Sequence, residues 1–268
     1  MKKRMISLAL ALCLALSLAV PVCAADVSDE TTIMPAESVH NYAPWPGNSD
    51  DPNWSSGSGS THQFITANAI TIVKNSYPTY PLSSYTSTLK LYSDYPDTSE
   101  SGQASDGFVG HFYDPDTGKS WNGATNPTAK ARLVWWYNNA VSEYRAGRTA
   151  SAMESLGCAL HYAADLSTPH HAANKVAVLS LHTQFESYAK NHQSSYAVTS
   201  ASADTFSWAK RTSIGDMGHN FAVYAKSIIN LADNQSTFAT ATQQTLPKAQ
   251  RNCAGVLYKF LVDVGRLN

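Results

Sequence analysis

Two histidine–carboxylate pairs with the same spacing are the residues of this chain best suited to do chemistry. His161 and Asp165 are four residues apart, and His182 and Glu186 repeat that spacing further along. Side chains four residues apart lie on one face of a helix, so each pair can present a ring nitrogen and a carboxylate oxygen together. One such pair is typical of a surface ion pair. Two pairs with His171 between them, in a chain with only 15% charged residues, favour a site for zinc, which binds both kinds of donor.

Helical patterns span most of the chain and would position these donors. Apolar residues recur at helical spacing, with Gly147 and Pro169 among the residues that separate the runs. The segment 77–127 is rich in Tyr, Pro, Gly, Asp and Ser, so we predict that it is mostly loop. Because hardly any alternating β pattern occurs, we predict an all-α protein, a single compact bundle of roughly seven to ten helices with a metal cluster between them. The predicted helices cover residues 62–74, 128–145, 151–165, 179–192, 205–231 and 247–264.

The composition of the chain narrows the class of protein. It has 268 residues, of which 43% are hydrophobic, and a formal charge of −1. These values fit one or two globular domains with an ample core, and they exclude a disordered chain, a collagen and a disulfide-dense miniprotein. A charge so close to zero gives no basic field that would attract nucleic acid, so we expect no nucleic-acid partner. We also expect a monomer.

The first 53 residues differ in composition from those that follow. Three basic residues precede an apolar run from Met5 to Val20, and a small-residue cleavage pattern ends at Ala24. We therefore predict a signal peptide over residues 1–24 and a secreted, extracellular protein. Residues 25–53 carry six acidic residues and four prolines but no Lys or Arg. We interpret them as an acidic pro-segment or linker, followed by the functional domain over residues 54–268.

Two cysteines, Cys158 and Cys253, remain once the predicted signal peptide is removed. Export permits a disulfide between them. Two cysteines within apolar helical patterns are as readily buried free thiols, so the sequence leaves both alternatives open.

Three segments of the chain occur in an order that resembles a known family. The first is His111-Phe-Tyr-Asp-Pro-Asp-Thr-Gly118, the second runs from His161-Tyr-x-x-Asp165 through Pro169-x-His171 to Asn174, and the third is His182-x-x-Phe185-Glu186-Ser-Tyr-Ala189. Together they resemble the signature segments of the secreted bacterial zinc-dependent phospholipase C family, which includes the catalytic domain of clostridial alpha-toxins. The resemblance runs from about Trp54 to the C-terminus. It departs at Ala164, where the signature usually has glycine or threonine.

The resemblance implies a zinc-dependent phospholipase C. Such an enzyme hydrolyses the glycerol-side phosphodiester bond of phospholipids at a membrane or micelle surface, and its products are a diacylglycerol and a phosphorylated head group. The segment from Tyr258 to Asp263 resembles the close of the family's catalytic domain. We therefore expect no C-terminal lipid-binding domain of the toxin kind.

Carried over position by position, the resemblance implies three zinc ions. Eight of the implied ligands bind through side chains, and one carboxylate is shared by two ions. The implied ligands are Asp97, His111, His161 and Asp165 for one zinc, His171, His182 and Glu186 for a second, and His62, the shared Asp165 and Trp54 for a third.

Some of these positions have alternatives in the sequence. The tryptophan would bind through its α-amino group and carbonyl oxygen, so the acidic segment before it would have to be cut away. Trp54 is favoured over Trp45 because the residues after Trp54 resemble the family's mature start. Asp94 is the alternative to Asp97, and we interpret Asp94 as a solvated turn residue. His170 matches a family position that is not a ligand.

The resemblance also implies roles in catalysis. Asp97 or Glu186 would take the proton of the attacking water as well as hold zinc, and the sequence leaves that choice open. Phe108 resembles a position that packs on the choline head group, where a cation–π contact is favourable, although a core or rim phenylalanine is the alternative. Thr98 stands where choline-selective relatives carry tyrosine, so the sequence does not predict a choline preference.

Two other functions remain open. A zinc-dependent single-strand nuclease or 3′-nucleotidase has the same helical fold and the same N-terminal tryptophan cluster. Glu186, where that family has aspartate, and the segment that begins at His111 argue against it. The other is a secreted protein that binds zinc or a surface without catalysis, and the completeness of the ligand set argues against that function.

Overall fold

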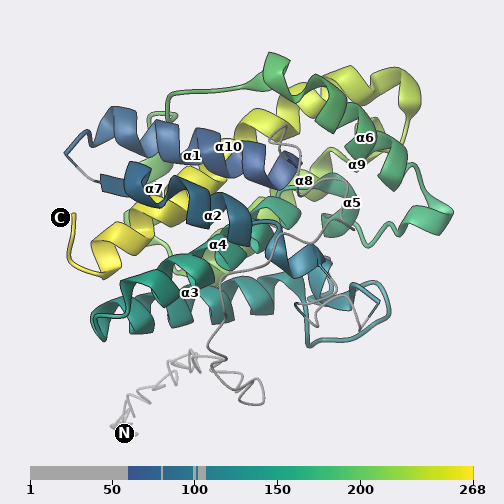
Figure 1. Ribbon diagram of the computed structural model, residues 1–268. Helices are drawn as coiled ribbons and strands as arrows, with labels where there is room; N and C mark the ends of the chain where they lie inside the picture. The colour runs from purple at the N-terminus through teal and green to yellow at the C-terminus, as the bar shows by residue number, and fades with distance from the viewer. Residues whose placement is uncertain (1–59, 80, 99–100, 102–106, 268) are drawn as a thin grey trace, which may run out of the picture. The chain divides into compact units, whose positions relative to one another are not determined.

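The described part of the chain is a bundle of helices (Figure 1). The computed structural model describes residues 60–79, 81–98, 101 and 107–267. No β-strand occurs in these ranges, which confirms the all-α prediction. The α-helices of the described residues are α1 (Thr61–Ser76), α2 (Thr86–Tyr92), α3 (Ala129–Arg145), α4 (Thr149–Asp165), α5 (Pro169–Ala172), α6 (His182–His192), α7 (Thr205–Arg211), α8 (Ile214–Ser227), α9 (Ile229–Ala232) and α10 (Phe238–Asp263). The short 3₁₀ helices among them are η1 (Pro81–Tyr85), η2 (Tyr95–Asp97), η5 (Val109–His111), η6 (Ala177–Leu179), η7 (Gln193–Tyr196) and η8 (Gln235–Thr237).

Helix α4 runs through the core of this bundle. Every residue from Ser155 to Asp165 is buried, and α4 packs against α1, α2, α3 and α10. A helix that is apolar on all sides belongs in the interior. Its last turn therefore places His161 and Asp165 inside the protein, where they are 0% and 1% exposed.

Side-chain caps fix where several helices begin. The Ser60 hydroxyl accepts a hydrogen bond from the backbone N–H of Gln63, and Thr128 and Ser213 cap α3 and α8 in the same way. Such caps satisfy backbone donors that have no partner inside the helix. The cap at Ser60 sets the start of α1, so it also sets the position of His62 in its first turn.

The structure corrects three of the predicted helix boundaries. The run 205–231 is three helices rather than one, because Thr212 is extended and Ser213 caps a new helix. Helix α6 begins at His182 rather than at 179, since η6 and an extended Ser180 precede it. Helix α10 begins at Phe238, nine residues before the predicted start at Pro247.

The proline explains the last of these errors. The predicted helix starts at Pro247, a residue that removes a hydrogen bond and costs about 3 kcal/mol when it lies inside a helix. The buried residues of α10 lie on both sides of Pro247, from Phe238 to Leu261. Burial of these side chains outweighs the cost of one proline. The segment 77–127 also contains one α-helix that the sequence did not predict, α2, besides the 3₁₀ helices η1, η2 and η5.

The two cysteines are buried free thiols, so the structure does not contain the alternative disulfide. The Cys253 thiol lies 3.7 Å from the carbonyl oxygen of Leu160, to which it donates a weak hydrogen bond. Burial raises the pKa of both thiols. No helix among the described residues is long and apolar enough to cross a membrane.

Candidate metal centre

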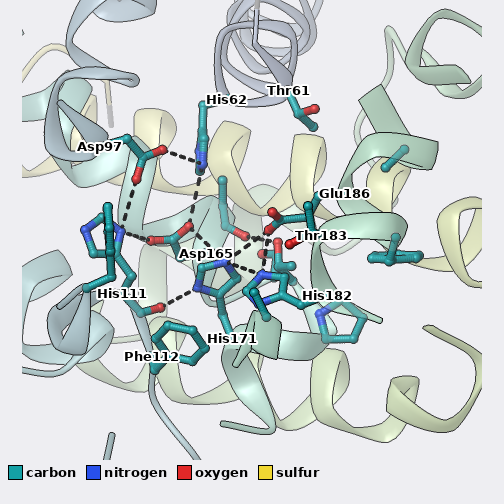
Figure 2. A pocket seen from close by; sticks show the side chains of 18 of the residues that line it. Thr61, His62, Asp97, His111, Phe112, Asp165, His171, His182, Thr183 and Glu186 are labelled. Carbon is teal, nitrogen blue, oxygen red and sulfur yellow. Dashed lines mark hydrogen bonds and ion pairs between the residues drawn. The ribbon is translucent and has the colours of Figure 1, made fainter. Parts of the chain in front are cut away.

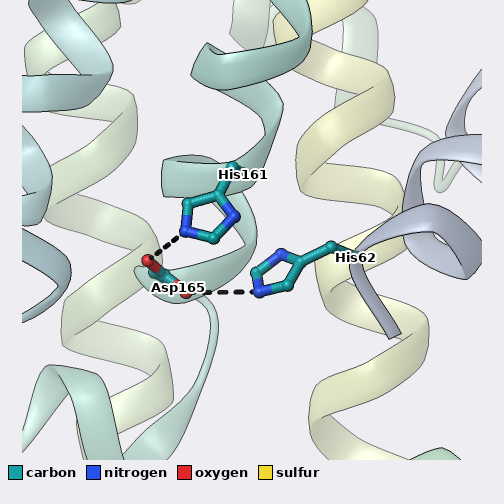
Figure 3. Close-up of side chains that lie close together, drawn as sticks. All are labelled: His62, His161 and Asp165. Atoms are coloured by element: carbon teal, nitrogen blue, oxygen red, sulfur yellow. Dashed lines mark ion pairs between the residues drawn. The ribbon is translucent and has the colours of Figure 1, made fainter. Parts of the chain in front are cut away.

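Eight of the nine predicted metal ligands converge on one place in the structure, seven of them labelled in Figure 2 and His161 in Figure 3. The ninth, Trp54, lies outside the described residues. Segments far apart in the sequence supply the eight side chains. These are His62 in the first turn of α1, Asp97 and His111 at the ends of η2 and η5, His161 and Asp165 in the last turn of α4, His171 in α5, and His182 and Glu186 in α6.

One group forms around the Oδ2 atom of Asp165. His111 Nδ1 lies 3.0 Å and His161 Nε2 3.1 Å from Asp165 Oδ2. The two ring nitrogens are 3.0 Å from each other. Asp97 Oδ1 completes the group, 3.5 Å from His111 Nδ1 and 3.6 Å from His161 Nε2. These are the four side chains predicted for the first zinc.

A second group lies on the other oxygen of the same carboxylate (Figure 3). His62 Nε2 is 3.6 Å from Asp165 Oδ1, and the His62 ring stacks on that of His161 at 4.1 Å between ring centres. Asp165 thus faces His62 with one oxygen and His111 and His161 with the other. Such an arrangement suits a carboxylate that bridges two cations, as predicted for the shared ligand.

The third group joins α5 to α6. Glu186 Oε1 lies 2.8 Å from His182 Nε2 and 3.2 Å from His171 Nε2, and the two ring nitrogens are 3.2 Å apart. His171 Nε2 also lies 4.0 Å from Asp165 Oδ1, so this group is adjacent to the other two.

Backbone carbonyl groups fix the orientation of two of these histidines. His161 Nδ1 lies 2.9 Å from the carbonyl oxygen of Ser93, and His171 Nδ1 lies 2.8 Å from that of His111. When Nδ1 donates its proton to a carbonyl, the neutral ring keeps a lone pair on Nε2. Both Nε2 atoms point into the centre, so both rings are held as metal ligands require.

The donor atoms fit zinc in spacing and in kind. Two ligands of one tetrahedral zinc, each about 2.0–2.1 Å from it, lie roughly 3.3 Å apart. Three sets of residues each offer donor atoms that lie within 4.8 Å of one another: His62, His161 and Asp165; Asp97, His111 and His161; and His171, His182 and Glu186. Nitrogen and carboxylate oxygen are the donors that zinc takes in catalytic sites. A buried carboxylate surrounded by imidazoles also needs positive charge for balance, which protons or metal ions supply.

The charges of the centre shift the pKa values of its members. Burial is the largest single influence and would lower the pKa of His161 and His171, but Asp165, a second carboxylate and hydrogen bonds together outweigh it and raise each pKa to about 9. Burial alone would raise the pKa of Asp165 and Glu186, but the histidines hold both well below their usual range. For His62, burial and the charge of His161 lower the pKa to about 4.

Asp94 corrects one interpretation made from the sequence. It was taken for a solvated turn residue, yet it is only 5% exposed. Its carboxylate accepts hydrogen bonds from Gln63 Nε2 at 2.6 Å and from the Ser60 hydroxyl. Burial raises the pKa of Asp94 to about 6, although these hydrogen bonds oppose the shift. Asp94 thereby ties the segment that carries Asp97 to the start of α1. No sequence pattern indicated this contact, which forms across 31 residues.

His170 lies outside all three groups, as a non-ligand position should. It is 0% exposed, and its ring stacks face to face on that of His182 at 5.0 Å, with 2° between the planes. Phe185 covers it at 5.4 Å. The His170 ring therefore packs against the ring of His182, a predicted ligand, and restricts its orientation.

The metal centre opens into a cavity of about 910 Å³. Asp97 and Glu186 are the carboxylates most open to it, with side chains 43% and 49% exposed. Phe108 lines the same cavity in the left-handed conformation, with φ 61°, and its ring lies 5.4 Å from that of His111. A bulky residue rarely adopts this conformation, which is disfavoured by steric contact with its own backbone. The structure thus holds the predicted substrate-contacting residue at the cavity.

Comparisons with known proteins agree with one another. A family model described as zinc-dependent phospholipase C matches residues 61–235, which include the eight predicted ligands that the structure describes. The phospholipase C of Paraclostridium bifermentans is 31% identical over 70% of this chain and 52% of that protein. The phospholipase C of Clostridium perfringens is 27% identical over 87% of this chain and 64% of that protein. Among solved structures, an alpha toxin from Clostridium absonum superposes with a TM-score of 0.71 at 25% identity, covering 79% of this chain and 66% of that one. The chain spans between about half and two thirds of the length of these relatives.

Proposed function

The chain belongs to the zinc-dependent phospholipase C family, and we propose that its metal centre hydrolyses the glycerol-side phosphodiester bond of phospholipids. The products would be a diacylglycerol and a phosphorylated head group. The observation that carries the proposal is the convergence of eight residues with nitrogen or oxygen donors, seven of which line one open cavity, in the order along the chain that the family signature has.

The proposal assigns roles to the residues of the centre. Zinc bound by the three groups would neutralise the phosphodiester oxygens and acidify a water molecule. Asp165, which is buried and faces histidines with both oxygens, serves as a shared ligand rather than as a base. Asp97 and Glu186 are open to the cavity, so one of them accepts the proton of the attacking water.

The head-group end of the substrate is proposed to lie against Phe108. Its exposed ring at the cavity can pack on an organic cation, which favours a head group with an ammonium group. Thr98, the position of a tyrosine in choline-selective relatives, is buried, and its hydroxyl donates to the carbonyl oxygen of Tyr95 at 2.7 Å. Thr98 therefore contributes no second aromatic face, and we propose an ammonium head group without a strict choline requirement.

The proposal extends to the segments outside the described residues. We propose that residues 1–24 direct export and that removal of residues 25–53 frees the α-amino group of Trp54 as a ligand for a third zinc. A chain that begins at Trp54 would then be active, and a chain that begins at Asn53 would lose zinc and activity although its helices fold. Highest activity for a chain that begins at Trp45 would instead assign the α-amino ligand to Trp45. Equal activity for all three would remove the amine from the ligand set.

The test of the function compares two substrates with the same zinc-loaded protein. Hydrolysis of phosphatidylcholine is measured by release of the phosphorylated head group, and hydrolysis of single-stranded nucleic acid is measured beside it. Faster turnover of the nucleic acid would replace the proposal by the nuclease alternative, and turnover of neither would exclude both enzymes.

Two carboxylate variants and a control complete the test. Asp97→Asn and Glu186→Gln are expected to lose activity, whereas Asp116→Asn, at an exposed residue paired with Lys226, should keep it. Zinc content is measured for each variant. The carboxylate whose loss removes activity but leaves the zinc content unchanged is the proton acceptor.

A further inference from the structure

Most of the large apolar side chains exposed on the described surface gather at the metal centre's cavity. Phe108, Trp121 and Val178 line the cavity and are 41%, 42% and 91% exposed. Leu179 follows Val178 and is 82% exposed. We call these four residues the apolar rim. Among the described residues, the other large apolar side chains that are this exposed are Val223 and Tyr224 of α8, which do not line the cavity.

Hydrogen bonds on both sides of η6 anchor the segment that carries Val178 and Leu179. The segment of Val178 is joined to that of Trp121 by Asn174, whose Nδ2 donates to the carbonyl oxygen of Lys119 at 3.1 Å. After η6, the backbone N–H of Leu181 donates to Asp233 Oδ1 at 2.7 Å. The rim therefore projects its side chains from an anchored segment, and none of the residues of η6 is buried.

Exposure of these apolar side chains to water costs free energy unless a partner covers the rim when the protein acts. Removing an aliphatic side chain such as that of Val178 or Leu179 from water is favourable by about 1.5–3 kcal/mol. Phe108 also keeps a strained backbone conformation, which holds its ring at the cavity. Apolar residues exposed together beside a site mark a surface that contacts a partner.

Size and charge favour a lipid surface over a second copy of the chain. A stable protein interface needs roughly 20–30 residues on each side, far more than the four residues of the rim. Leucine, phenylalanine and tryptophan are the side chains that enter the boundary between head groups and acyl chains. The carboxylates that line the cavity, Asp97, Asp165 and Glu186, all belong to the metal centre, where histidines and bound zinc would offset their charge towards phosphate groups.

We propose that the apolar rim docks the protein on the surface of a lipid aggregate, with its side chains inserted among the head groups and the cavity opening onto the surface. This inference rests on the proposed function, which requires a substrate that resides in such a surface. The rim then brings the metal centre to the depth of the phosphodiester. It should therefore increase the rate of hydrolysis of aggregated lipid but not that of dissolved substrate.

The test compares aggregated and dissolved substrate in a rim variant. Val178→Ser/Leu179→Ser is assayed on phosphatidylcholine vesicles and on short-chain phosphatidylcholine below its critical micelle concentration. The ratio of the vesicle rate to the monomer rate is expected to fall about tenfold or more, because two apolar contacts with the lipid are lost. The control Val223→Ser, the same kind of change on α8, should alter that ratio less than about twofold. Equal loss of both rates would mean that the segment shapes the cavity, and an unchanged ratio would also overturn the proposal.

Vesicle binding separates failure of the docking surface from failure of the proposed function. Flotation of the protein with phosphatidylcholine vesicles needs no catalysis, so it reads out docking even if no phospholipid is cleaved. Binding that is about tenfold weaker in the rim variant and unchanged in the control supports the proposal. A dimer in sedimentation that the rim variant abolishes would instead assign the rim to contact between two copies.

Discussion

At the scale of single residues, Asp165 organises the metal centre. One of its oxygens faces His111 and His161, and the other faces His62. His161 is oriented in turn by the carbonyl oxygen of Ser93. Ligands held in this way need little rearrangement on binding metal, because their rings are already fixed by second contacts.

Two adjacent histidines should respond differently to removal of their side chains. His171→Ala is expected to lower activity by 100-fold or more and to reduce the zinc content, because His171 Nε2 lies with His182 and Glu186 in one group. His170→Ala removes a ring that stacks behind His182 and lies 3.5 Å from Asp233 Oδ1, so zinc should be retained and activity should fall less than tenfold. Elemental analysis and hydrolysis rates measure both effects. Equal loss of zinc in the two variants would show that the ligand assignment is wrong.

Zinc binding should release protons at neutral pH. The pKa values of His161 and His171 are raised to about 9, so both rings carry a proton at pH 7 that the metal must displace. Zinc affinity should therefore fall as the pH decreases below about 9, because protons then compete with the metal for the ring nitrogens. Above that pH the rings are already deprotonated, so zinc binding should release no protons from them. Calorimetric titrations with zinc in two buffers of different ionisation enthalpy measure the released protons. Identical heats in both buffers at pH 7 would contradict the prediction.

At the scale of elements, the packing of α2 on α4 decides where several ligands lie. Gly157 of α4 faces α2, and a Cβ atom there would come within 2.5 Å of the Cβ of Tyr92 and 3.1 Å of the carbonyl oxygen of Leu89. The residue after α2 is Ser93, whose carbonyl orients His161. The close approach of the two helices is therefore a condition for the geometry of the centre.

Gly157→Ala should destabilise the protein although alanine favours helices. The added methyl group meets α2 and forces the two helices apart, which we expect to lower the free energy of unfolding by about 1–2 kcal/mol. Displacement of Ser93 should also lower zinc affinity. Gly215→Ala in α8 is the matched control, because its Cβ would have only ordinary contacts from 3.6 Å outward. Thermal unfolding and zinc titration of both variants test this, and equal stability of the two would refute the packing argument.

At the scale of the whole molecule, the metal centre joins elements from across the described chain. Its donors come from α1, η2, η5, α4, α5 and α6, so bound metal crosslinks the first described helix to the middle of the sequence. A ligand that binds only the folded state stabilises that state.

Removal of metal should therefore loosen the fold as well as abolish activity. We expect close to three zinc ions per active chain, and chelation should lower the melting temperature by on the order of 10 °C. Re-addition of zinc should restore both activity and stability. Elemental analysis, with calorimetry before and after chelation, measures these quantities. A single zinc ion in fully active protein would contradict the three-site arrangement, and an unchanged melting temperature would contradict the crosslink.

Local patterns in the sequence were sufficient for the helical class and for the pairs within one helix. His161 with Asp165, and His182 with Glu186, could be paired because the period of a helix is set by the backbone alone. Boundaries were less predictable. Pro247 lies within α10 because burial on both of its sides outweighs a local preference that the sequence pattern records.

The sequence by itself determined which residue types could bind metal and, with the family resemblance, which positions they occupy. Only the tertiary structure decided that Asp165 divides its oxygens between His62 and His111, that Asp94 is buried against Gln63, and that the two cysteines remain unpaired. It also decided that Val178 and Leu179 are exposed at the cavity, although a run of apolar residues would equally fit a core. The physical reason is that spacing along a helix is a local property of the backbone. Contacts between distant segments depend instead on how whole helices pack.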